Sequence, residues 1–131
     1  MLVYKNTLIK LAHATIFHRE DGIVEVCLLK NSRIDVKKCE EILAVYDQLL
    51  ENKKYPHLYI VEDYVTIDKD ARSYSASERG LQYSKAEAYV FTSLAHKIIA
   101  NFYIKINKPA VPTRFFKSKN EALKWLKNQS V

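Results

Sequence analysis

The chain has 131 residues, of which 48% are hydrophobic, and a formal net charge of +6 at pH 7. This size and apolar content suit one domain that buries a core without disulfides or metals. No apolar run resembles a signal peptide or approaches the roughly 20 residues that cross a bilayer. We therefore expect a single soluble, cytoplasmic domain over residues 1–131, with no membrane insertion.

The positive charge is concentrated at the C-terminal end. Residues 92–131 carry eight Lys and Arg against one Glu, whereas residues 1–91 carry 13 basic against 14 acidic side chains. Such an asymmetry can mark contact with nucleic acid, anionic lipid or an acidic partner. The alternative, which we favour, is that these lysines form the solvated faces of two amphipathic helices. Nucleic-acid binding is not expected, because no Arg-rich run accompanies the lysines.

The N-terminal half begins with two segments of strand character. Residues 7–18 alternate apolar and polar positions, and residues 23–29 follow a turn-like Asp21-Gly22, which predicts a β-hairpin. From Asp35 the apolar residues take helical spacing, which predicts a helix that ends before Tyr55-Pro56.

The C-terminal half continues as alternating strands and helices. The expected strands are residues 57–62, 85–91 and 113–116, and the expected helices are residues 68–77, 93–107 and one that a Ser118–Glu121 capping box opens. The helix at residues 93–107 has an apolar stripe that we expect to face the core, with His96 on the opposite, solvated side. The stripe consists of Leu94, Ala95, Ile98, Ile99, Phe102 and Ile106.

The predicted order is ββαβαβαβα, which indicates an α/β fold with a mainly parallel sheet, one antiparallel edge strand and helices packed on it. This order resembles the STAS fold of bacterial anti-sigma-factor antagonists. Four segments look like the pattern of a small, functionally uncharacterised bacterial STAS-like group. They are residues 69–72, 101–109, 112–116 and 121–126.

The STAS resemblance directs attention to Thr66. In signalling members of that family, a Ser or Thr after the third strand is phosphorylated and controls partner binding, and Thr66 is the hydroxyl near the corresponding turn. The acidic neighbours Asp63, Asp68 and Asp70 would repel a phosphate, and the family's Asp-Ser-Ser/Thr-Gly pattern is absent. The alternative is an ordinary turn hydroxyl or helix cap.

Residues 101–114 carry more apolar surface than one core-facing stripe requires. Tyr103 and Ile104 are the expected surplus, and they either form an interface or pack under the loop that contains Pro109 and Pro112. A basic rim beside them would suit a protein contact or a pocket for an acidic, partly apolar ligand. The candidate contact residues are Arg72, His96, Asn101, Tyr103, Ile104, Lys105, Lys108 and Arg114.

Residues with catalytic chemistry are scattered along the chain. There is no nucleophile elbow and no Gly-rich phosphate loop, and Cys27 and Cys39 lack zinc-site spacing and are expected to be buried free thiols. We therefore expect no enzyme activity, metal or cofactor. The preferred hypothesis is a non-enzymatic STAS-like binding or regulatory module that acts through protein–protein contacts and forms a homodimer. The alternative is a small-molecule or lipid-binding domain with a basic C-terminal pocket.

Overall fold

The structure is a computed structural model that describes residues 6–129. The strands are β1 Ile9–Lys10, β2 Ala14–His18, β3 Val24–Leu28, β4 Arg33–Ile34, β5 Tyr55–Val61, β6 Thr66–Ile67, β7 Ser84–Val90 and β8 Thr113–Phe116. The helices are α1 Val36–Leu49, α2 Lys69–Ser75, α3 Leu94–Phe102, the π-helix η1 Tyr103–Asn107 and α4 Lys119–Gln129.

Six strands form the main sheet in the order β1-β2-β3-β5-β7-β8, and β4 pairs with β6 in a separate small sheet. Strands β3, β5, β7 and β8 run parallel to one another, whereas β2 is antiparallel to both β1 and β3. The predicted α/β fold and its mainly parallel sheet are confirmed. The sequence predicts one antiparallel strand at the edge of the sheet, but the antiparallel strand β2 is second in the order. The edge position is taken by the short β1, which was not predicted as a separate strand.

Polar side chains open the helices where the sequence predicts that helices begin. Asp35 caps α1 by accepting from the backbone N–H of Lys38 at 3.0 Å, and Asp68, Ser93 and Ser118 accept comparable bonds at the other three α-helices. Each cap satisfies an N–H that lacks a partner within the helix. The predicted cap at Ser118 is thereby confirmed, and Asp35 is the cap of the helix that the sequence predicts from that residue.

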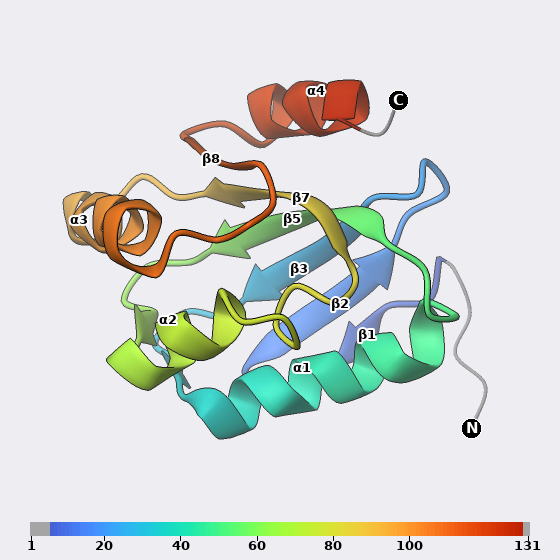
Figure 1. Cartoon of the computed structure of the whole chain (residues 1–131), viewed down its shortest axis with the longest axis horizontal. Coiled ribbons are helices and arrows are strands. Elements are labelled where there is room, and N and C mark those ends of the chain that lie inside the picture. The colour runs from blue at the N-terminus through green and yellow to red at the C-terminus, as the bar shows by residue number, and fades with distance from the viewer. Residues whose placement is uncertain (1–5, 130–131) are drawn as a thin grey trace.

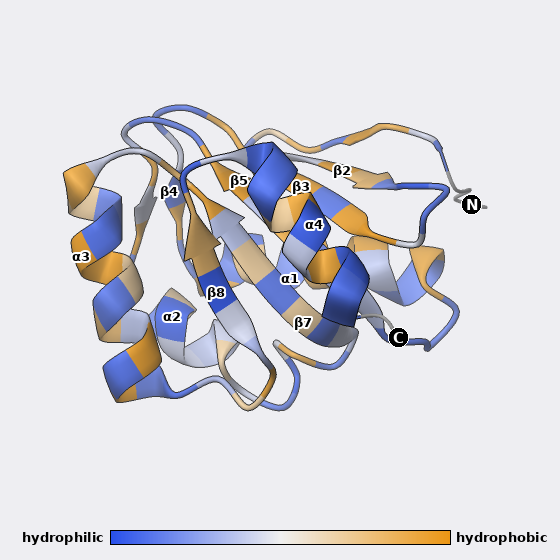
Figure 2. Cartoon of the chain, turned by 90° about the horizontal axis from the view of Figure 1, so that it is seen from above, coloured by the Kyte–Doolittle hydropathy of each residue, from blue (hydrophilic) through white to orange (hydrophobic). Residues whose placement is uncertain are grey.

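The two faces of the sheet are covered by different helices. Helix α4 lies on one face, and α1 and α2 lie on the other, with α3 at one end of that second layer (Figure 1). Seen from the α4 side, α4 crosses the sheet while α3 stands beside β8, with hydrophobic segments recurring along its length (Figure 2). The chain therefore forms three layers around one central sheet.

Alternation along β5 and β7 divides the side chains between these faces. Leu58, Ala86 and Ala88 belong to a cluster of apolar residues that includes Ala122 and Leu126 of α4. The intervening residues on the same strands point toward α1, α2 and α3, because successive side chains of a strand face opposite ways. These are His57, Tyr59 and Val61 on β5 and Glu87 and Tyr89 on β7.

Helix α3 packs with the face opposite to the one that the sequence predicts. Most of the apolar stripe is exposed: Leu94 by 73%, Ile98 by 60%, Phe102 by 55% and Ile106 by 64%. His96 is buried instead, so the prediction that it is solvated is wrong. Its ring fits inside because Nε2 donates a hydrogen bond to the carbonyl oxygen of Val65 at 2.7 Å, which offsets the cost of burying a polar group.

The remaining structural predictions concern thiols and membrane segments. Cys27 and Cys39 are free thiols, as predicted, but both are only half-buried. Among residues 6–129, no helix is both long enough and apolar enough to cross a membrane.

Candidate ligand-binding cavity

A cavity of about 110 Å³ lies between the sheet and the helices α1, α2 and α3. An engineered apolar cavity of roughly 150 Å³ takes up benzene, so this smaller one has room for a short branched group, and a ring would extend into its mouth. Most of its wall is apolar. The lining includes Leu28, Ile34, Ile42, Leu43, Val61, Val65, Ile67, Phe91, Ile99, Ala100 and Phe115.

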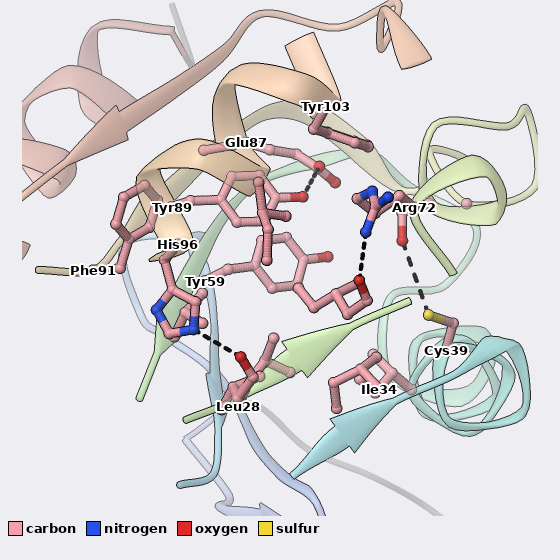
Figure 3. A pocket seen from close by; sticks show the side chains of 18 of the residues that line it. Leu28, Ile34, Cys39, Tyr59, Arg72, Glu87, Tyr89, Phe91, His96 and Tyr103 are labelled. Atoms are coloured by element: carbon pink, nitrogen blue, oxygen red, sulfur yellow. Dashed lines mark hydrogen bonds between the residues drawn. The ribbon is translucent and has the colours of Figure 1, made fainter. Parts of the chain in front are cut away.

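The polar part of the lining includes several tyrosines and a single carboxyl group. Tyr59 and Tyr89 point into the cavity from neighbouring strands, and Glu87 lies beside them next to Tyr103 (Figure 3). Tyr46 reaches the same space from α1. Parallel pairing of β5 with β7 sets Tyr59 directly against Tyr89, and their rings stack with centroids 5.0 Å apart.

Glu87 is a buried carboxyl group whose hydrogen-bond donors are neutral. Its Oε2 accepts from the Ser84 hydroxyl at 2.7 Å, and its Oε1 accepts from the Tyr89 hydroxyl at 2.8 Å. Burial raises the pKa of Glu87 to about 7, although both hydrogen bonds oppose the rise, because removal from water disfavours the charged form. Near neutral pH this side chain is therefore poised between its acid and carboxylate forms.

The tyrosine hydroxyls around Glu87 are incompletely paired. The Tyr46 hydroxyl lies 3.2 Å from that of Tyr59. The Tyr103 hydroxyl is buried and makes no well-formed hydrogen bond within residues 6–129, although it lies near enough to Tyr89 to interact with it. Burial raises the pKa of all four phenols, so each remains a neutral donor at physiological pH.

Arg72 and Cys39 complete the wall on the α1 and α2 side. Arg72 donates from its guanidinium Nη1 to the carbonyl oxygen of Ile67 at 2.7 Å, a contact visible in Figure 3. The Cys39 sulfur lies 3.9 Å from the Ser75 hydroxyl. Burial raises the pKa of the Cys39 thiol to about 11, so it does not supply a reactive thiolate at neutral pH.

A family model described as a domain of unknown function, DUF7793, matches residues 17–130. The chain belongs to the DUF7793 family. No curated protein matches its sequence.

Solved structures similar to the DUF7793 chain bear on the fold. An uncharacterised DUF3478-family protein from Shewanella loihica PV-4, described as having a SpoIIAA-like fold, matches with a TM-score of 0.54 and 15% identity over 92% of this chain and 90% of its own. A protein of unknown function from Arthrobacter sp. FB24 matches with a TM-score of 0.31 and 22% identity over 90% of this chain and 95% of its own. The first match confirms the predicted STAS-like fold; the second is too weak to carry an argument.

Three of the eight predicted contact residues line the cavity of the DUF7793 chain. They are Arg72, His96 and Tyr103. Tyr103 is 6% exposed and belongs to the interior, so it does not supply surplus surface. The structure therefore favours the packed interpretation of this ring over the interface interpretation.

The other predicted contact residues lie outside the cavity. Asn101 and Lys105 flank a shallow surface depression beside Phe102, and Ile104, Lys108 and Arg114 are exposed. Arg114 lies over the Phe116 ring at 5.4 Å. No lysine of residues 6–129 lines the cavity, so it is not the basic pocket that the sequence predicts.

Thr66 is exposed in β6, opposite Arg33 of β4. The cap of α2 is Asp68, so Thr66 does not occupy the helix N-terminus that would stabilise a phosphate. Phosphorylation of Thr66 stays an untested prediction, and no helix N-terminus at Thr66 would stabilise the phosphate.

The sequence reasoning missed Glu87, the residue that gives the cavity its chemistry. A signal was present, because Glu87 interrupts the apolar part of its strand between Ala86 and Val90 and shares its strand face with Tyr89. Among residues 6–129, no cluster of three or more His, Cys, Asp or Glu side chains could hold a metal ion.

Proposed function

We propose that the DUF7793 chain is a non-enzymatic ligand-binding domain that holds a small, mostly apolar molecule in the cavity beneath α3. The observation that carries this proposal is the apolar cavity of about 110 Å³ with one buried carboxyl group, Glu87, on its wall. Most small-molecule sites combine an apolar lining with a few polar groups that orient the ligand. The cavity thus favours the ligand-binding hypothesis over the protein-contact module that the sequence led us to prefer.

The apolar wall alone supports only weak binding. A ring-sized molecule that loses about 150 Å² of apolar surface to the cavity gains roughly 4 kcal/mol, which corresponds to a Kd on the order of 1 mM. Tighter binding requires a polar contact or a ligand that continues through the mouth of the cavity. Glu87, Tyr103 and Arg72 are the polar groups placed to provide that contact.

A cavity-filling substitution tests this function. Ala100 is 6% exposed and lines the cavity from α3, so Ala100→Leu places three additional carbon atoms in the space. In an NMR titration with benzyl alcohol, we expect shifts at cavity residues of the wild type and their loss in Ala100→Leu. Ala44→Leu is the matched control, because Ala44 is exposed on α1. Unchanged binding in a folded Ala100→Leu protein would refute the proposal.

A second function, homodimerisation, is favoured by the exposed stripe of α3. Leu94, Ile98, Phe102 and Ile106 recur at four-residue intervals and remain largely uncovered. Aligned apolar side chains of this kind mark interaction surfaces more often than scattered ones do. We therefore place the expected homodimer contact on this stripe and not at Tyr103.

Sedimentation analysis tests the homodimer. We expect the wild type to sediment as a dimer and Ile98→Asp to sediment as a folded monomer. Leu8→Asp is the control, since Leu8 is another exposed apolar residue far along the chain from α3. A monomeric wild type at all accessible concentrations would remove the dimer hypothesis.

A further inference from the structure

Among residues 6–129, no cationic side chain forms an ion pair with Glu87. Both carboxylate oxygens accept hydrogen bonds only from the neutral hydroxyls of Ser84 and Tyr89. Within residues 6–129, every ion pair closer than 4 Å involves other carboxylates. A buried carboxylate without a cation is costly, and a ligand that supplies the cation would remove that cost.

Arg72 does not neutralise Glu87, although both line the cavity. The Arg72 guanidinium donates to the backbone carbonyl of Ile67 at 2.7 Å and forms no ion pair with Glu87. In Figure 3 the two side chains approach the cavity from different elements, with the guanidinium directed toward Ile67. The Glu87 carboxylate is therefore available to pair with a cationic ligand.

Aromatic rings surround this carboxyl group. The Tyr59 and Tyr89 rings stack at 5.0 Å, and Tyr103 meets Tyr89 edge-on at 6.2 Å. Phenol rings present negative charge at their faces and attract organic cations, most strongly where water is excluded. A carboxylate combined with tyrosine rings is the chemistry that recognises an ammonium group.

We propose that the cavity binds the ammonium end of an organic amine, with the cation paired to Glu87 and its carbon atoms packed against the tyrosine rings. This inference rests on the proposed ligand-binding function and specifies its ligand class. The volume of about 110 Å³ suits an ammonium group attached to a short branched chain, and a ring attached to it would extend into the mouth of the cavity.

Three probes of similar size distinguish the possible ligand classes: benzylamine, benzyl alcohol and benzoate. Each carries the same ring with a cationic, neutral or anionic substituent. Titrations at pH 8, above the pKa of about 7 for Glu87, are followed by NMR. Hydrogen bonds to charged groups contribute roughly 1.5–3 kcal/mol, so we expect benzylamine to bind at least about tenfold more tightly than benzyl alcohol.

Glu87→Gln removes the charge and retains the shape of the side chain. We expect this variant to lose the preference for benzylamine while still binding benzyl alcohol as the wild type does. Glu41→Gln, on the exposed surface of α1, is the matched control and should retain the wild-type preference. The wild-type ranking of the probes remains a test even if Glu87→Gln does not fold.

The other outcomes separate this inference from the proposed function. Equal binding of benzylamine and benzyl alcohol would overturn the ammonium assignment and leave the apolar cavity in place. Tightest binding of benzoate would overturn it in favour of an acidic ligand held by Arg72. Failure of all three probes to bind would overturn both the assignment and the ligand-binding function.

Discussion

The two faces of the central sheet are built by the same strands and serve different purposes. On the α4 side, Leu58 of β5 and two alanines of β7 pack closely on Ala122 and Leu126. On the opposite side, the intervening residues are large, aromatic or ionisable, and they leave a cavity. The α4 face therefore stabilises the fold, whereas the opposite face is packed less tightly and places polar groups around a cavity. Sites that bind ligands commonly depart in this way from the rules that govern cores.

The largest expected effect is on the α4 face. Leu126→Ala should lower the free energy of unfolding by about 3 kcal/mol, because Leu126 is fully buried and the truncated side chain leaves a cavity. Urea denaturation measures the loss, and Leu126→Met should lose less than about 1.5 kcal/mol. A small loss for Leu126→Ala would contradict the tight packing of this face.

The next effect concerns Glu87 on the cavity face and depends on pH. Burial raises the pKa of Glu87 from 4.5 to about 7, so between these values the folded state holds a proton that the unfolded chain has released. Glu87 therefore destabilises the fold progressively as pH rises through this interval. Glu87→Gln should gain roughly 2 kcal/mol relative to the wild type between pH 5 and pH 8.

Denaturation of both proteins at the two pH values measures this difference. Burial lowers the pKa of His57 to about 4, so His57 costs stability as pH falls below 6.5, but this contribution is common to both proteins and cancels. The charged or titratable groups that face the cavity with Glu87 also remain in both proteins. They are Cys39, Tyr46, Tyr59, Arg72, Tyr74, Tyr89, His96 and Tyr103. A constant difference across the pH range would contradict the burial of the carboxyl group.

A smaller effect separates two tyrosine hydroxyls of the cavity. Tyr46→Phe should lose about 1 kcal/mol, because it removes a hydrogen bond and leaves the Tyr59 hydroxyl unpaired. Tyr103→Phe should leave the stability unchanged or raise it, because the Tyr103 hydroxyl is buried without a well-formed bond. Thermal denaturation compares the two variants. An equal loss in both would show that Tyr103 is satisfied within the protein and is not held for a ligand.

The smallest effect lies on the exposed stripe of α3. Ile98→Ser should change the free energy of unfolding by no more than about 0.5 kcal/mol, measured at protein concentrations where the chain is monomeric. Ile99, which lines the cavity, provides the neighbouring comparison, and Ile99→Ser should destabilise by roughly 2 kcal/mol. A larger loss of stability for Ile98→Ser than for Ile99→Ser would instead show that the face of α3 that carries Ile98 is buried, as the sequence predicts.

The sequence predicts the order of the main elements because each has a strong local signal. The alternation at β2, the helical spacing of α1 and the capping residues Asp35 and Ser118 are properties of single segments. Short pairings such as β1 with β2 and β4 with β6 carry too few residues to produce a periodic pattern.

The cavity could not be predicted in the same way, because it depends on which face of α3 turns inward. Ile98 and Phe102 are more hydrophobic than His96 and Ala100, so hydrophobic periodicity selects the wrong face. The decisive contact is the hydrogen bond from His96 to the Val65 carbonyl, which joins residues 31 positions apart in the chain. Only Glu87 gave a local signal, as a charged residue between the apolar residues Ala86 and Ala88 of a strand.

A crystal of the DUF7793 chain soaked with benzylamine at pH 8 would show whether the cavity binds an ammonium group beside Glu87. We expect the ring of benzylamine between Tyr89 and Ile99 and its nitrogen within hydrogen-bond distance of Glu87. A closed interior, with Tyr103 and Ile99 packed onto Glu87 and no probe between them, would contradict it.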